Sequence, residues 1–132
     1  MEEWWEKYPD RFQEECKKME EYTNAWMRLP DGSGLPGEFS PGVYLAWEEI
    51  VTSNSGRRYR ILIVSQRDHP YSPPIAWILE PEVRKVHHML GDGRLCLHGP
   101  SITPDKTYVL NLRNWACEWI DCYERGDWRT LS

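Results

Sequence analysis

The sequence predicts an α+β domain in which helices accompany a short antiparallel sheet. Apolar residues recur every three or four positions near both ends of the chain, which indicates a helix at each end. Between them lie three short segments rich in β-branched and aromatic residues, typical of strands. The 132 residues fit one domain, residues 1–132, and are enough to bury a core without disulfides.

An aromatic stripe, interpreted as core packing rather than a ligand site, predicts the first helix. The residues that form it are Trp4, Tyr8, Phe12, Cys16, Met19, Tyr22 and Trp26. Because proline is tolerated in a first turn but not in a helix interior, Pro9 places the main helix over residues 9–27, after a short turn or kink. The acidic residues at the start of the chain are expected to form a solvated face. They are Glu2, Glu3, Glu6, Asp10, Glu14, Glu15, Glu20 and Glu21.

The three strands follow a loop rich in proline and glycine at residues 29–41. The first two strands are predicted over residues 42–52 and 58–66, joined by a hairpin turn that contains Asn54 and Gly56. The second strand is apolar on both faces, so it is expected to be buried on both. Residues 68–74 hold three prolines and form a rigid, extended loop that includes His69. The third strand is predicted over residues 75–79.

The last element is a helix with clear signals at both ends. Asn111 can cap its start, and Gly126 follows the final apolar turn as the glycine just beyond a helix end. Cys122 lies on the apolar face of this helix and Cys117 lies off it. Because the two thiols point in different directions, a disulfide or shared metal is not expected, and both are interpreted as structural.

Composition excludes several classes of function. The net charge is −5 and no basic run is present, so nucleic-acid binding is not indicated. No apolar run approaches the ~20 residues of a membrane-spanning helix, and the acidic start is unlike a signal peptide. A reduced cytoplasmic location is therefore expected, with four free cysteines of which at least one can be reactive.

Cys96 is the best candidate for the reactive thiol. It follows a Gly-Asp-Gly turn at residues 91–93 and lies between two leucines that can anchor its backbone, with His88 before the turn and His98 after the cysteine. A thiolate is the nucleophile in such sites, and a nearby histidine can raise its fraction. On these residues alone, a buried thiol, a zinc site and a catalytic Cys–His pair all remain open.

Two motifs in the right order resemble the ubiquitin-conjugating enzymes, the E2 family. Tyr71-Ser72-Pro73-Pro74 before a strand is similar to the family's Tyr-Pro-x-x-Pro-Pro segment. Gly93-Arg94-Leu95-Cys96-Leu97 is similar to its Gly-x-Ile/Leu-Cys-Leu active-site segment. The order of helix, meander, active-site loop and helix also matches over about residues 9–123, which implies a UBC-like fold. The chain ends soon after the last helix, so the family's usual C-terminal helices are expected to be short or absent.

The family's His-Pro-Asn tripeptide differs here. His88 stands at the Asn position, eight residues before the cysteine, and Val86 and His87 precede it. This histidine resembles the prokaryotic E2-like proteins, which are encoded with E1-like, deubiquitinase-like or cyclic-nucleotide synthase partners. Some of these belong to antiphage defence operons of the CBASS type.

The resemblance implies transthioesterification through Cys96. This cysteine would accept the C-terminal glycine of a ubiquitin-like protein or a cyclic-nucleotide synthase from an E1-like protein or another acyl donor. The thioester would then pass to an amine of a protein target, usually a lysine. His88 would stabilise the oxyanion or act as a base. His87, His98 and Asp127 are possible supports, and Asp127 can also be interpreted as a solvated loop acid. No cofactor, nucleic acid or membrane partner is expected.

Two other functions compete with this interpretation. A zinc site could be built from His87 or His88 with Cys96 and His98, and metal analysis of the purified protein would reveal it. Alternatively, the chain could be a non-catalytic E2-fold scaffold. A Cys96→Ala variant that keeps full cellular function would favour the scaffold.

Overall fold

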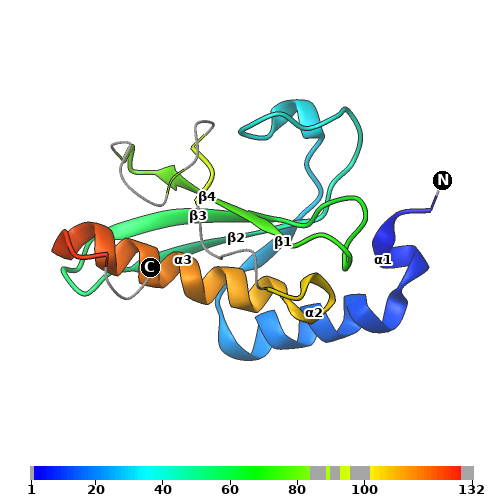
Figure 1. The fold of residues 1–132 in the computed structure, drawn as a ribbon, viewed down its shortest axis with the longest axis horizontal. Coiled ribbons are helices and arrows are strands. Elements are labelled where there is room, and N and C mark those ends of the chain that lie inside the picture. The colour runs from blue at the N-terminus through cyan, green and yellow to red at the C-terminus, as the bar shows by residue number, and fades with distance from the viewer. Residues whose placement is uncertain (1, 84–88, 90–92, 96–101, 129–132) are drawn as a thin grey trace.

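The computed structural model describes residues 2–83, 89, 93–95 and 102–128 (Figure 1). These residues contain the helices α1 (Trp4–Lys7), α2 (Pro9–Tyr22) and α3 (Val109–Arg125), and two short 3-10 turns at Gly32–Gly34 and Pro104–Lys106. The strands β1 (Trp26–Arg28), β2 (Ala46–Thr52), β3 (Arg58–Val64) and β4 (Ile75–Glu80) form one antiparallel sheet in the order β1-β2-β3-β4. The predicted α+β class is confirmed.

The helices lie on one face of the sheet, and the loop between β1 and β2 rises over the other face (Figure 1). β3 is buried on both faces, as predicted, because its side chains alternate between two apolar clusters. Ile61 and Ile63 join the cluster under the helices, whereas Leu62 and Val64 join a smaller cluster on the outer face. We call these two surfaces the helix face and the outer face of the sheet.

The first helix ends earlier than predicted. Pro9 begins α2 after the short helix α1, as expected, but α2 stops at Tyr22 and residues 26–28 form the edge strand β1. The helix ends at Thr23, which takes an extended conformation (φ −139°, ψ 170°) and whose hydroxyl and N–H both donate to the Met19 carbonyl, at 2.6 and 3.0 Å. Tyr22 and Trp26, assigned to the buried stripe, are 63% and 42% exposed, so that part of the prediction is wrong.

The strands are close to their predicted positions. β2 begins at Ala46 rather than at residue 42, because the residues before it belong to the loop that crosses the outer face. The predicted hairpin turn is present, with Gly56 at φ 87° and the Ser53 N–H donating to the Arg57 carbonyl at 2.8 Å. β3 ends at Val64 and β4 extends one residue further than predicted, to Glu80.

The last helix has the predicted end and a slightly earlier start. Gly126 adopts the left-handed conformation at φ 69° directly after α3, and its N–H donates to the Cys122 carbonyl. Glycine takes this conformation without the steric cost of a Cβ atom. Asn111 caps the helix from its third residue, where its side-chain oxygen accepts the Tyr108 N–H at 2.8 Å. Cys122 is fully buried and Cys117 is half-buried, as the predicted helix face requires. No helix among the described residues is long and apolar enough to cross a membrane.

Candidate active site

Leu95, the residue immediately before Cys96, is held in the core. It is 5% exposed and belongs to the apolar cluster on the helix face. Its N–H donates to the Ala76 carbonyl of β4 at 2.9 Å, and it forms an antiparallel bridge with Met89. Gly93, at φ 88°, takes a backbone conformation that other residues rarely adopt. The expectation that Leu95 acts as a buried anchor is confirmed.

Four of the predicted site residues lie outside the described residues, namely Cys96, His87, His88 and His98. Their roles therefore stay predictions, and the zinc alternative, which uses the same residues, does so as well. Asp127 is described, and it lies just beyond α3 with Oδ2 at 3.7 Å from Arg125 Nη1. Among the described residues, no three His, Cys, Asp or Glu side chains are placed to hold a metal ion.

An open cleft of about 670 Å³ lies on the outer face, and we call it the outer cleft. Its lining residues come from the β1–β2 loop, the β3–β4 loop, β4 and the segment before Cys96. They are Glu38, Phe39, Ser40, Tyr44, Gln66, Arg67, Asp68, Ile75, Trp77 and Arg94. Because Leu95 faces the helices and Arg94 lines this cleft, the chain just before Cys96 presents successive side chains to opposite faces of the sheet.

The wall of the outer cleft is held by Arg67. Its guanidinium lies over the Tyr44 ring at 4.4 Å, donates to the Tyr44 hydroxyl at 3.0 Å, and donates to the Pro41 carbonyl at 2.6 Å. Gly42 must be small here, because an added Cβ would come within 2.4 Å of this guanidinium, and its φ of 120° is also unusual for other residues. The loop that forms one side of the cleft is therefore fixed to the β3–β4 loop.

Trp77 lines the outer cleft and carries a buried N–H donor that has no acceptor among the described residues. The side chain is 3% exposed, and its ring packs 5.5 Å from that of Phe39. Its Nε1 is buried and has no hydrogen-bond partner in the part of the chain that the structure describes. A Cβ on Gly93 would lie 3.9 Å from Trp77 Cδ1, the ring atom bonded to Nε1. The pyrrole edge of this indole therefore faces the segment that leads to Cys96.

Three other thiols are described, and none is activated. Burial raises the pKa of Cys16, and the nearby carboxylates of Glu15 and Glu20 raise it further. Burial likewise raises the pKa of Cys117, despite the opposing charge of Arg113. Cys122 is fully buried in the helix face. Thiols with a raised pKa or without access to solvent are poor nucleophiles at neutral pH.

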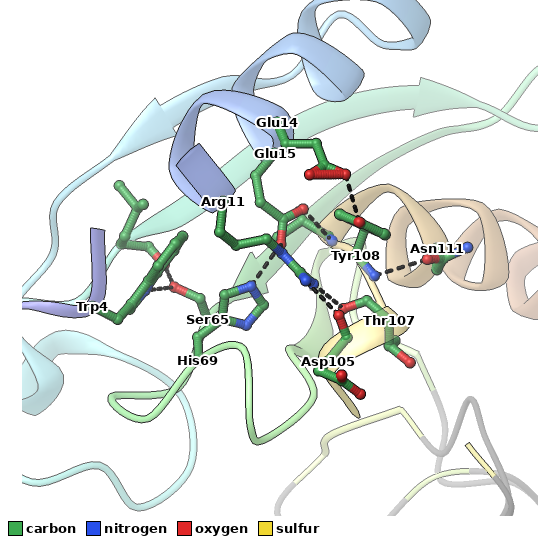
Figure 2. Close-up of polar contacts among 12 residues, drawn as sticks. Trp4, Arg11, Glu14, Glu15, Ser65, His69, Asp105, Thr107, Tyr108 and Asn111 are labelled. Atoms are coloured by element: carbon green, nitrogen blue, oxygen red, sulfur yellow. Dashed lines mark hydrogen bonds and ion pairs between the residues drawn. The ribbon is translucent and has the colours of Figure 1, made fainter. Parts of the chain in front are cut away.

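A buried polar network, which sequence reasoning missed, joins α2 to the loop before β4 and to the start of α3 (Figure 2). Glu15 is fully buried, which contradicts its assignment to the solvated face. One oxygen accepts from His69 Nε2 at 2.6 Å, and the other accepts the Val109 N–H at 2.9 Å. His69 is in the predicted loop but is itself fully buried, with Nδ1 lacking a partner among the described residues. A hydrogen on Nε2 gives this Glu15 oxygen its donor.

Arg11 extends the network toward the start of α3. Its Nε donates to Glu15 at 3.2 Å, and its Nη2 donates to the Thr107 carbonyl at 3.1 Å. The guanidinium also lies 3.9 Å from the centre of the Tyr108 ring. Figure 2 shows these side chains meeting between the two helices. A signal existed in the sequence, because Glu15 falls on the same helical face as Phe12 and Met19.

The comparisons with known proteins give one match. A family model described as "Type II CBASS E2 protein" matches residues 34–130, which include the outer cleft, the Leu95 anchor and Cys96. No curated protein and no solved structure matches the chain.

Proposed function

Because the chain belongs to the type II CBASS E2 proteins, a family of CBASS antiphage defence, we propose that it is an acyl transferase that works through a thioester on Cys96. The carried group is the C-terminal glycine of a partner protein, either a ubiquitin-like protein or a cyclic-nucleotide synthase. The observation that carries the proposal is the family match over the segment that contains Cys96, together with the anchored leucine before it.

In the first step, the Cys96 thiolate attacks the carbonyl carbon of an activated C-terminal glycine. The donor is an E1-like protein that holds this glycine as a thioester or an adenylate. The new S–C bond forms as the donor's C–S bond breaks and releases its thiol, or as the C–O bond breaks and releases AMP. The proton of the Cys96 thiol passes to a base or to the leaving group. No oxidant or reductant is needed.

In the second step, an amine of the target attacks the thioester carbon. The C–N bond forms, the C–S bond breaks, and Cys96 leaves as a thiolate while the amine loses a proton. His88 is proposed to donate a hydrogen bond to the tetrahedral oxyanion, and one good donor of this kind contributes roughly 3–4 kcal/mol. A neutral imidazole also has an acceptor nitrogen, so His88 can take the proton of the incoming amine.

The three described thiols are poorly suited to accept an acyl group, which favours Cys96 as the nucleophile. Cys16 and Cys117 have a raised pKa, and Cys122 is fully buried, so none of the three is suited to accept an acyl group. Leu95 adds a positioning argument, because its own N–H bonds to β4 and its own side chain is buried in the core. When the residue before a nucleophile is fixed in the core, the backbone that leads to the nucleophile starts from a defined position.

Intact mass spectrometry without reductant tests the proposal. The protein is mixed with its E1-like donor and the glycine-ended partner, and an adduct that a thiol reductant removes is expected for wild type. Cys96→Ser is expected to give an oxyester that resists the reductant, and Cys96→Ala no adduct. Cys117→Ser is the matched control and should charge like wild type. An adduct that persists in Cys96→Ala would refute the assignment.

A second measurement separates the two steps. His88→Ala is expected to slow discharge to a lysine-containing acceptor more than it slows charging. If wild type never forms an adduct, and Cys96→Ala retains full antiphage protection in cells, the scaffold function replaces the enzymatic one. Bound zinc in the purified protein, lost in Cys96→Ala, would instead support the metal site.

A further inference from the structure

We propose that β1 pairs with β1 of a second copy of this chain, as antiparallel strands related by a two-fold axis at Met27. This inference goes beyond the proposed function, because it assigns a partner to residues that the thioester chemistry does not use. The strand also precedes residues 34–130, which the family model matches.

β1 is the open edge of the sheet. In the order β1-β2-β3-β4, which can be followed in Figure 1, only β1 and β4 have a second side to offer. β4 accepts the Leu95 N–H at its Ala76 carbonyl, whereas no described residue pairs with β1 on the side away from β2. All three residues of β1 are exposed. An open edge presents backbone N–H and C=O groups that another strand can bond.

Apolar side chains gather around this edge. Four large ones fall within residues 22–29, and we call them the β1 edge patch: Tyr22 is 63% exposed, Trp26 42%, Met27 47% and Leu29 60%. Tyr22 is the last residue of α2, and Leu29 directly follows β1. Single exposed apolar residues are normal on a protein surface, but a group of them marks an interaction site.

The register with β2 fixes the face on which each β1 side chain lies. Arg28 lies opposite Ala46, which belongs to the outer-face cluster. Opposite residues of antiparallel strands point to the same face, and so do residues two apart on one strand. Arg28 and Trp26 therefore point to the outer face. Met27 lies opposite Trp47 of the helix-face cluster, so it points to the helix face.

This arrangement is complementary to a second copy of itself. A two-fold axis perpendicular to the sheet at Met27 places Met27 opposite its own copy, and Trp26 opposite Arg28 of the second copy, twice. An indole attracts a guanidinium, and such cross-strand pairs stabilise a sheet. An axis at Arg28 is excluded, because it sets two like charges opposite each other and brings Pro30, which has no N–H, into the pair.

The other charges on this face agree with the register. Arg28 forms an ion pair with Glu48 of its own chain, and Arg60 Nε lies 3.3 Å from the same carboxylate. The Arg28 side chain is still 45% exposed, which leaves surface for an indole to cover. Because Glu48 lies opposite Trp26, the indole in the joined sheet has Glu48 on one side and the second Arg28 on the other. Only residue 28 of the three paired positions is charged, so no like charges meet.

The size of the patch predicts weak pairing. A large aromatic side chain can bury roughly 150–250 Å², so the exposed fractions leave about 100 Å² on each residue and about 400 Å² per copy. A standard stable interface buries about 800 Å² per partner. We therefore expect a dissociation constant on the order of 10–100 μM. The Leu95 anchor, bonded to β4 at the opposite edge, stays outside this interface.

Sedimentation velocity in the presence of reductant, at about 5 to 500 μM protein, brackets that range. Wild type is expected to pass from monomer to dimer. Met27→Lys sets two like charges opposite each other at the axis and should raise the dissociation constant about tenfold or more. Tyr71→Lys is the matched control, because Tyr71 is 63% exposed in the β3–β4 loop, and it should dimerise like wild type. Circular dichroism checks that each variant is folded.

A pair of variants at Trp26 tests the register. Trp26→Lys and Trp26→Glu remove the same indole, but the lysine faces Arg28 of the second copy with a like charge and the glutamate with an opposite one. Trp26→Lys should therefore have a dissociation constant about fivefold or more above that of Trp26→Glu. The negative net charge of the chain works in the other direction, so this order is specific to the proposed contact.

Cross-linking tests the position of the axis. Cα atoms directly opposite in an antiparallel pair are about 4.5–5.5 Å apart, within the range that a disulfide can bridge. In a Cys96→Ala background, Met27→Cys is expected to form a dimer on a non-reducing gel when oxidised glutathione accepts the electrons of the two thiols. Tyr71→Cys, an equally accessible thiol, should stay monomeric.

Each result bears on the proposal. Wild type that remains monomeric at about 500 μM overturns it, as does a dimer that Met27→Lys leaves unchanged. If the dimer forms but Met27→Cys cross-links no faster than Tyr71→Cys, β1 does not pair with its own copy. Equal dissociation constants for Trp26→Lys and Trp26→Glu likewise refute the register.

Discussion

Replacing Glu15 with alanine is expected to destabilise the protein by about 3–5 kcal/mol, because one buried carboxylate serves donors from three segments. Arg11 lies on α2 with Glu15, His69 precedes β4, and Val109 begins α3. Glu15 and His69 have no exposed side-chain surface, so water cannot replace the lost acceptor without a local opening of the fold.

The magnitude follows from the donors left behind. The His69 Nε2 hydrogen and the Val109 N–H are both buried, and each costs about 1–3 kcal/mol without an acceptor. Two such groups give about 4 kcal/mol at the middle of the range. Arg11 adds little, because its guanidinium keeps the Thr107 carbonyl as an acceptor and its side chain is 11% exposed. The total is a large part of the ~5–15 kcal/mol by which proteins are normally stable.

Urea denaturation followed by tryptophan fluorescence measures this loss. Glu20→Ala is the matched control, because it removes an exposed glutamate from the same helix and should change stability by no more than about 0.5 kcal/mol. Glu15→Gln keeps an acceptor for Val109 and the same volume, so it should cost less than Glu15→Ala. A loss below about 1 kcal/mol in Glu15→Ala would refute the account of the network.

Three further predictions concern the anchor, the alkaline limb of stability and the described thiols. Leu95→Ala should cost about 2–5 kcal/mol in urea denaturation and also lower charging of Cys96, whereas the volume-conserving Leu95→Met should cost less than about 1.5 kcal/mol. Burial and the hydrogen bond to Glu124 raise the pKa of Tyr59 to about 12. The folded state therefore holds this proton more tightly, and the associated stability is complete below pH ~10 and lost as the pH rises toward 12. Tyr59→Phe lacks that contribution, so its stability deficit relative to wild type should shrink between pH 10 and 12, and a constant deficit would contradict the assignment. Cys16 and Cys117, whose pKa values are raised, should react with iodoacetamide at pH 7.5 more slowly than an unstructured peptide thiol, as peptide mass spectrometry can measure.

Features that depend on local backbone chemistry could be predicted from the sequence. Pro9 begins the main helix, and Gly56 and Gly126 adopt the positive φ values that their turns require. β1 could not be predicted, because Trp26 continues the three- and four-residue spacing of the aromatic stripe. Pairing with β2, from Trp26 opposite Glu48 to Arg28 opposite Ala46, decides the conformation there, and no local pattern contains that information.

The candidate site divides in the same way. Leu95 could be predicted as an anchor, because a leucine beside the cysteine is expected to be buried, and it does join the apolar cluster. The Glu15–His69 pair joins positions 54 residues apart, and a glutamate among seven other acids has no local mark of burial. The burial of the Trp77 indole nitrogen, which has no partner among the described residues, is also a property of the fold, since it depends on which loops pass over the outer face.

β4 links the two halves of the proposed site. The Ala76 carbonyl accepts the Leu95 N–H, and Trp77, the next residue along the strand, lines the outer cleft. Leu95 and Trp77 are therefore positioned by one rigid element rather than by separate loops. A change that displaces β4 should disturb stability and charging together, because both depend on this strand. A change at the exposed rim of the outer cleft, such as Glu38, should leave stability and charging unchanged, since it touches neither the anchor nor the core.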